Sequence, residues 1–121
     1  MIEFLIEELL NNQFIDKISD ECADYVMNLS GGKISDYFDN LVDYARLDVI
    51  DNVILNDFKE EIIDGQNEIS GLATVLAEVE GVVHWGGEDE NIGSKTIALH
   101  IEFVFYMFEK KAEEFSIISI C

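Results

Sequence analysis

Proline is absent from the 121 residues, and cysteine occurs only twice, at Cys22 and Cys121. No low-complexity linker and no internal repeat divides the chain, so we expect a single domain spanning residues 1–121. The two cysteines lie far apart and form no metal-binding motif, which excludes a zinc site of the Cys-x-x-Cys type and argues against a disulfide. Rare, unpaired cysteines are typical of a reducing compartment, and we therefore expect a cytoplasmic protein.

Long apolar runs and basic residues are also scarce. No apolar stretch is long enough to cross a membrane, and residues 1–10 lack the basic start and the cleavage site of a secretory signal. Only 7 Lys and Arg residues stand against 26 Asp and Glu residues, which gives a net charge of −19. Such a chain repels the phosphates of nucleic acids and of anionic lipids, and this excludes both as partners. It favours a basic protein partner that associates quickly and in a salt-sensitive way.

The first half of the chain has the apolar periodicity of helices. Apolar residues recur three and four positions apart in the stretches 2–10, 18–29, 38–45 and 49–62. Asp16 stands where the N-cap of the second helix is expected, and Gly65 follows the last stretch, where a helix would end. Residues 1–64 are therefore predicted to form three to four helices.

After Gly65 the apolar period changes to two. Apolar side chains occupy the odd positions from Ile69 to Trp85 and from Ile97 to Met107, while the even positions are mixed and hold the charged residues. This alternation predicts two long strands, each with one buried face. Gly71 and Gly81 predict bulges or bends in the first of them.

Two turns are expected to join the strands. Residues 88–95 are predicted to form the first hairpin connection and residues 110–114 the second, which leads into a short third strand over 115–120. The simplest fold is α+β, in which the N-terminal helices pack on the odd face of a three-stranded antiparallel meander formed by residues 66–121.

Motifs for catalysis and for metal binding are missing. Cys22 lies on an apolar helical stripe, which predicts a core position and not a nucleophile. A calcium loop starting at Asp89 fails, because Gly93 and His100 occupy positions where that loop needs acidic ligands. His84, His100 and the glutamates of the even face have the composition of a zinc or iron site but no tight ligand spacing, and the alternative is an ordinary solvent-facing surface. We expect neither an enzyme nor a bound cofactor.

Acidic residues recur at helical spacing, so that each set shares one helix face. The two clearest sets are Asp16, Asp20 and Asp24, and Asp36, Asp39 and Asp43. Spaced carboxylates can imitate a phosphate backbone and occupy a site that normally binds phosphates; the alternative is an ordinary solvated acidic surface. Glu88, Asp89 and Glu90 add three acids to the predicted loop. Tyr37 and Tyr44 lie among the acids, where they would either anchor an interface or cap the core.

In its small size, acidic composition, single domain and lack of catalytic motifs, the chain resembles bacterial immunity proteins. These neutralise nuclease toxins of contact-dependent inhibition and other polymorphic toxin systems. It is also similar to phage-encoded inhibitors that mimic DNA. The resemblance covers the whole chain and rests on no diagnostic motif. It implies an inhibitory protein that occludes a basic nuclease toxin stoichiometrically. An exposed edge of the meander could support pairing of two copies, so we expect a monomer or weak homodimer. A phage-type DNA mimic and a small metal-binding protein or enzyme are the alternatives.

Overall fold

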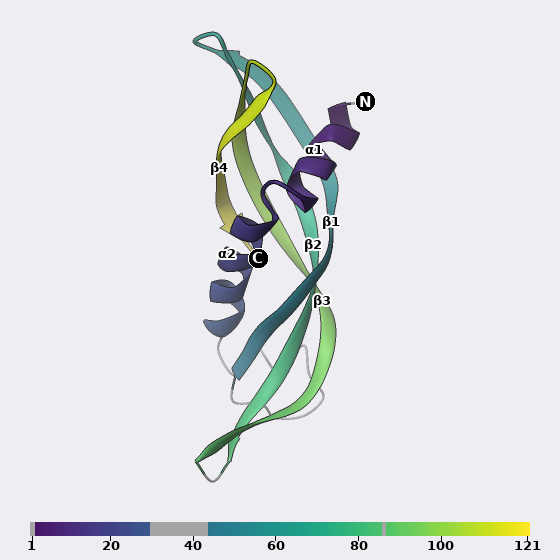
Figure 1. Cartoon of the computed structure of the whole chain (residues 1–121), viewed down its shortest axis with the longest axis vertical. Coiled ribbons are helices and arrows are strands. Elements are labelled where there is room, and N and C mark those ends of the chain that lie inside the picture. The colour runs from purple at the N-terminus through teal and green to yellow at the C-terminus, as the bar shows by residue number, and fades with distance from the viewer. Residues whose placement is uncertain (1, 30–43, 86) are drawn as a thin grey trace.

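The computed structural model describes residues 2–29, 44–85 and 87–121, with residues 84, 85 and 88–92 described by their backbone alone. These residues form the elements α1 (Ile2–Asn11), α2 (Ile15–Met27), β1 (Tyr44–Ile63), β2 (Gln66–Trp85), β3 (Glu88–Phe108) and β4 (Lys111–Ile120). The strands make one antiparallel meander in the order β1-β2-β3-β4, and both helices pack on the same face of it (Figure 1). The α+β class is confirmed, with a sheet of four strands in place of three.

The core lies between the helices and the inward face of the sheet. The odd positions of β3 from Ile97 to Phe105 are buried, whereas the even positions are exposed or half-buried, as the alternation predicts. Of the apolar residues that the periodicity of the two helices selects, Ile6, Leu10, Ile18, Cys22 and Val26 are buried, whereas Ile2 and Leu5 are exposed. The apolar pattern therefore placed the inward face of β3 correctly and the helical side of the core in part.

The start of α2 differs from the prediction. The residue before the helix is Phe14, and no side chain caps the helix, so the prediction that Asp16 is the N-cap was wrong. Phe14 is buried, and its ring stacks on that of Phe115 of β4 at a centroid distance of 4.4 Å. Aromatic packing in the core therefore fixes the chain where the helix begins. Asp16 lies in the first turn, where a carboxylate favours the positive end of the helix dipole.

The strand β1 replaces the helix predicted over residues 49–62. Its pairing with β2 shifts by one residue at three places, and the register skips Asp48, Asp51 and Asn56. Each bulge lengthens the spacing of inward-facing residues from two to three. As a result Leu47, Ile50 and Val53 all pack on the core at a spacing that imitates a helix. The preceding helix predicted over 38–45 falls mostly outside the described residues, and Tyr44 and Ala45 belong to β1.

Both predicted turns were too long. Trp85 pairs directly with Glu88, so the β2–β3 connection has only two residues, and Gly87 has φ of 88°. Tight hairpin turns require left-handed backbone, which glycine adopts without strain. Residues 88–95 therefore belong to a strand and not to a loop. The β3–β4 turn consists of Glu109 and Lys110, both at positive φ, and residues 111–114 are already part of β4.

Side chains of α1 cover part of the free edge of β1. Asn11 Nδ2 donates to the carbonyl oxygen of Val53 at 2.9 Å, and the Val53 N–H donates to Asn11 Oδ1, also at 2.9 Å. The Leu55 N–H donates to Glu7 Oε2 at 2.9 Å. These bonds replace those that a neighbouring strand would make, and they protect this edge from pairing with another chain.

We expect Asn11→Ala to lower the free energy of unfolding by about 1–2 kcal/mol, because the Val53 carbonyl oxygen loses its donor and the Val53 N–H keeps only the weaker contact with Asn52 Oδ1 at 3.0 Å. Urea denaturation measures the change. Asn12→Ala is the matched control, since among the described residues the exposed Asn12 side chain bonds only the Glu8 carbonyl oxygen of its own helix. Equal effects of the two substitutions would contradict the role given to Asn11.

Candidate protein-interaction surface

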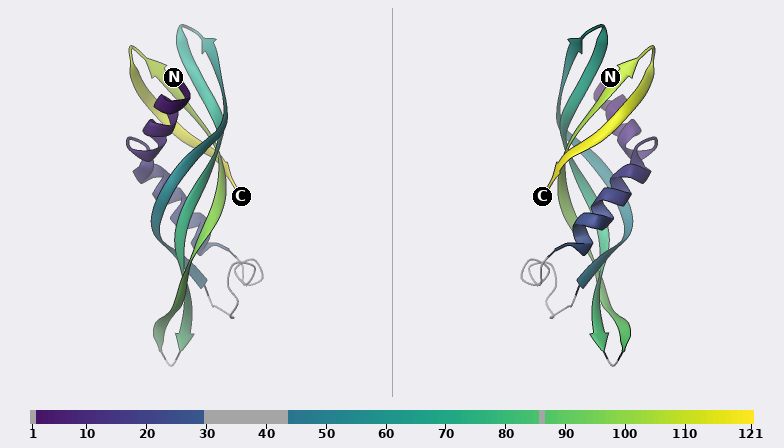
Figure 2. Two further views of the ribbon diagram at one scale, coloured as in Figure 1. Left: turned by 90° about the vertical axis from the view of Figure 1, so that its right-hand side faces the viewer. Right: turned by 90° about the vertical axis from the view of Figure 1, so that its left-hand side faces the viewer.

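The face of the sheet opposite the helices is not covered by any described element (Figure 2). Its outward-pointing side chains come from β1, β2 and β3, and we call this surface the open face. It consists of Arg46, Val49, Asn52, Ile54, Asp57 and Lys59 of β1, Ser70, Leu72, Thr74, Leu76, Glu78 and Glu80 of β2, and Thr96, Ala98, His100, Glu102 and Val104 of β3.

Exposed apolar side chains on the open face lie beside acids. Val49, Ile54 and Leu72 are 46%, 38% and 51% exposed. Val49 lies opposite Glu78, and Leu72 lies between Asp57 and Glu102 in one cross-strand row. Removing apolar area from water is favourable by about 25 cal/mol per Å², and an acidic surround selects a partner of opposite charge. The composition is therefore that of a surface able to bind a basic protein.

A hollow of about 220 Å³ lies on this face beside Leu72. Asp57 and Glu102 line it together with Leu72, and Phe58, Lys59, Ser70 and Gly71 complete its wall. Long basic side chains bury their aliphatic stem against apolar surface and direct the charged end toward carboxylates. The hollow has the chemistry to receive one lysine or arginine side chain of a partner.

The absence of a side chain at Gly71 keeps β1 and β2 close together next to the hollow. A Cβ atom at this position would overlap the carbonyl oxygen of Asp57, and it would lie 3.0 Å from Cζ of Phe103 and 3.1 Å from Cα of Phe58. Phe103 is fully buried, so it has no room to move away. The sequence predicted a bulge or bend in β2 at Gly71, but the neighbouring register shift lies in the partner strand β1, between Leu55 and Asp57.

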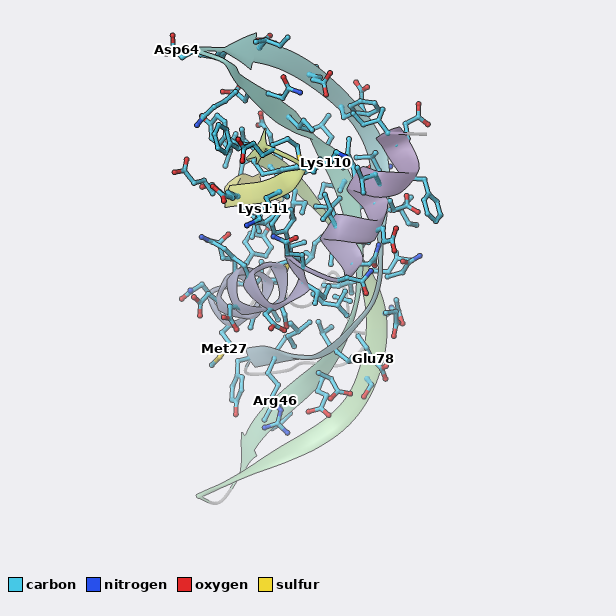
Figure 3. The ribbon with its side chains drawn as sticks, turned by 45° about the horizontal axis from the view of Figure 1, so that its top comes forward. Met27, Arg46, Asp64, Glu78, Lys110 and Lys111 are labelled. Carbon is cyan, nitrogen blue, oxygen red and sulfur yellow. The ribbon has the colours of Figure 1, made fainter. Side chains whose placement is uncertain are left out.

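The basic residues of the open face pair with acids of the protein itself. Arg46 Nε donates to Glu80 Oε2 at 2.7 Å, and Lys59 Nζ lies 3.6 Å from Glu61 Oε1. Among the described residues, Glu78 and Glu102 make no ion pair. In Figure 3, Arg46 and Glu78 lie on the half of the sheet nearer the β2–β3 turn, far from Lys110 and Lys111. The open face therefore has an excess of negative charge.

His100 belongs to a polar row on this face. Thr74 Oγ1 donates to Asn56 Oδ1 at 2.8 Å and lies 3.3 Å from His100 Nδ1. Among the side chains that the structure describes, no three histidine, cysteine or acidic groups come together as metal ligands. The side chain of His84 is not among them, so the alternative of a metal site that includes His84 and His100 is untested.

The acid ladder of α2 is exposed, as its spacing predicts. Asp16, Asp20 and Asp24 all point to solvent, on the side of the helix away from the buried residues Ile18 and Cys22. Because α2 covers the inward face of the sheet, this ladder and the open face lie on opposite sides of the molecule (Figure 2). The two acidic surfaces cannot contact one flat partner at once.

The remaining predicted contact residues have different outcomes. Asp36, Tyr37, Asp39 and Asp43 lie outside the described residues. Tyr44 begins β1 and is half-buried.

Glu88, Asp89 and Glu90 were predicted to extend from a loop tip, and this was wrong. Their backbone pairs with Trp85, His84 and Val83 inside the sheet. A turn of only two residues leaves no loop to hold them, so the three acids are strand residues.

The sequence did not predict the hollow, although it predicted the position of one residue that lines it. The alternation on β3 placed Glu102 on the outward face. Asp57 was assigned to a helix, because the bulges of β1 conceal its period of two. The close approach at Gly71 depends on β1, so no signal within β2 alone could show that a hollow forms there.

Cys22 is a core residue, as its apolar stripe predicts. Its side chain is buried and forms no disulfide with the exposed Cys121. Burial, with a smaller contribution from Glu21, raises the pKa of the Cys22 thiol from 9.0 to about 11. The thiolate is the reactive form, so this thiol is protected from attack on electrophiles at neutral pH.

We expect a thiol reagent at pH 8 to label Cys121 alone in the folded protein and both cysteines in denaturant. Mass spectrometry of the labelled protein counts the modified thiols. Rapid native labelling of Cys22 would contradict its placement in the core.

Because the pKa of the Cys22 thiol is higher in the folded protein than in the unfolded one, the contribution of this thiol to stability is complete below pH 9.0 and is lost as the pH rises toward about 11.

Neither of the described helices has the length and the apolar character that crossing a membrane requires. No protein-family model matches the chain, and no curated protein or solved structure matches it either.

Proposed function

We propose that the protein is an acidic inhibitory binding protein whose open face captures a basic protein partner. The observation that carries the proposal is the hollow at Leu72, which the carboxyl-bearing residues Asp57 and Glu102 line together with Leu72 and Phe58. A lysine or arginine of the partner, inserted there, would be the anchor, and Val49 and Ile54 would bury further apolar area. The net charge of −19 would speed the encounter.

The partner that suits this surface best is a nuclease toxin domain, and the protein would be its immunity protein. Nucleases bind phosphates through lysine and arginine side chains, and carboxylates compete for the same groups. Stoichiometric occlusion needs no catalytic residue in the inhibitor. The expected complex therefore forms quickly at low salt and dissociates slowly through its buried anchors.

Co-expression with the product of the adjacent reading frame tests the proposal. We expect the two proteins to co-purify, and the association rate to fall steeply as the salt concentration rises. A pair that does not co-purify, or an association rate independent of salt, would argue against an electrostatic inhibitor.

The exposed ladder of α2 favours a second candidate, an inhibitor that mimics DNA. Asp16, Asp20 and Asp24 repeat once per helical turn on one surface. Its partner would be a defence nuclease of the host, and its gene would lie in a phage operon. Substitutions confined to the open face or to the ladder of α2 distinguish the two candidates.

A further inference from the structure

An apolar stripe of α1 stays partly exposed beside the sheet. Ile2 and Leu5 are 37% and 45% exposed, and Leu9 is half-buried. These residues recur at the helical spacing of the predicted stripe, next to Ile6 and Leu10, which the core buries. The stripe is therefore wider than the core covers, and the rest of it lines the surface between α1 and the sheet.

Two adjoining hollows lie along this stripe, near the β3–β4 turn. Their volumes are about 570 and 280 Å³, and the smaller one reaches Ile69 and Phe105. The residues that line both are Leu5, Leu9, Met107 and Lys110. Because the hollows share these walls, they form one groove, which we call the α1 groove. The larger volume alone is within the range of about 300–1,000 Å³ that small-molecule sites occupy.

The positive charge of the α1 groove comes from the β3–β4 turn. Lys110 and Lys111 lie there beside α1 (Figure 3), and both line the larger hollow together with Glu113. Among the described residues, neither lysine forms an ion pair. In a chain with only 7 Lys and Arg residues, two adjacent lysines at an apolar groove mark a place that attracts an anionic group.

The turn holds Lys110 in a backbone conformation that lysine rarely adopts. Glu109 and Lys110 have φ of 48° and 70°. Two-residue hairpin turns need this left-handed backbone, and asparagine and glycine adopt it most easily. Glycine in place of Lys110 would therefore remove the amine and relieve the backbone strain at once.

We infer that the α1 groove binds a free long-chain carboxylate. Its alkyl chain would lie along Leu5, Leu9 and Met107, where apolar contact removes it from water. Its carboxylate would accept hydrogen bonds from the ammonium groups of Lys110 and Lys111. The inference does not depend on the basic partner of the open face, because α1 packs on the other face of the sheet (Figure 2).

The shape of the groove and the charge of the chain select this occupant. α1 forms one wall and β3 and β4 form the other, so the groove encloses one chain and not the flat surface of a bilayer. A second copy would repel the first, since each carries a net charge of −19. Salt screens that charge beyond about 8 Å, so the two nearby lysines dominate the attraction of a single carboxylate within the groove.

The elements that flank residues 30–43 lie away from the α1 groove. The start of β1 pairs with the part of β2 near the β2–β3 turn, at the end of the sheet opposite the β3–β4 turn. The end of α2 lies toward the same end as the start of β1 (Figure 1). The groove is therefore distant from both ends of that segment.

Dodecanoate, titrated into the full chain below its micelle concentration, tests the inference. We expect saturable binding, with the largest amide shifts at Leu5, Leu9 and Lys111. Affinity should rise by about threefold for each CH₂ group added from hexanoate to decanoate. Lack of binding, or shifts confined to residues outside the groove, would overturn the site.

Dodecanol and vesicles of phosphatidylcholine define the class of ligand. Dodecanol has the same alkyl chain without the charge, and we expect it to bind about tenfold more weakly than dodecanoate. Equal affinity would overturn the role given to the lysines. We expect no binding to the vesicles, and co-sedimentation with them would overturn the assignment to a free carboxylate.

The double substitution Lys110→Gly and Lys111→Gln tests the lysines without loss of the fold. We expect it to unfold at the same or a higher urea concentration, because glycine adopts the positive φ of residue 110 without strain. Affinity for dodecanoate should fall by about tenfold or more. Lys17→Gln with Lys59→Gln removes the same charge from exposed positions elsewhere, and an equal loss in this control would overturn the assignment.

Leu5→Asn and Phe4→Asn compare two neighbouring positions of α1. Leu5 lines the groove, whereas Phe4 is 74% exposed and lines a different hollow beside β1. We expect Leu5→Asn to weaken dodecanoate binding by about fivefold or more and Phe4→Asn to leave it unchanged. The opposite order would place the ligand on the other side of α1 and overturn the site.

Discussion

Gly71→Ala should lower the free energy of unfolding by about 2–3 kcal/mol, a large effect for the addition of one methyl group. The added Cβ would overlap the Asp57 carbonyl oxygen and press on the fully buried ring of Phe103. To relieve the overlap, β1 must move away from β2, which loosens the pairing of both strands. Urea or thermal denaturation measures the loss.

The neighbouring substitution Leu72→Ala is the control for Gly71→Ala. Leu72 is 51% exposed on the open face, so its truncation removes little buried area. We expect its effect to stay below about 1 kcal/mol. If the Gly71→Ala protein were as stable as the natural chain, the close approach of β1 to β2 would be wrong, and with it the origin of the hollow.

Reversing the charges of the hollow should have the largest effect on partner binding. We expect the double substitution Asp57→Lys and Glu102→Lys to weaken the affinity for the co-purified partner by about a hundredfold or more, because it replaces two charge-assisted contacts with repulsion. Calorimetry or surface binding measures the change. We expect the fold to persist, because Asp57 and Glu102 are both exposed, and circular dichroism checks this.

The matched control is the double substitution Asp16→Lys and Asp20→Lys on α2. It changes the net charge by the same amount, so it reduces long-range attraction equally without touching the open face. We expect only a modest loss, mostly in the association rate. A larger loss on α2 than at the hollow would show that the helical ladder is the interface and that the proposed surface is wrong.

The core of the fold follows from the sequence where strands and helices are regular. The alternation from Ile97 to Phe105 predicted the buried face of β3, because each residue there pairs in register with β2. The same reasoning failed on β1, where bulges at Asp48 and Asp51 turn a period of two into one of three. A single sequence does not distinguish that pattern from a helix, since the partner strand determines where a bulge forms.

Some parts of the candidate site also follow from the sequence, and others do not. The outward position of Glu102 followed from alternation, and the exposure of the α2 ladder followed from helical spacing. The hollow did not, because it needs Asp57 of β1, Leu72 of β2 and Glu102 of β3 in one cross-strand row. Contacts between strands that lie far apart in sequence depend on the register of their pairing. The spacing of residues within one strand does not determine that register.

The central claim is that the open face, and not the helical face, binds a basic partner. Amide NMR of the labelled protein with its co-purified partner tests it most directly. We expect the largest shifts at Asp57, Leu72 and Glu102, with little change at Asp16, Asp20 and Asp24. Shifts confined to α2, with the open face unchanged, would contradict the claim.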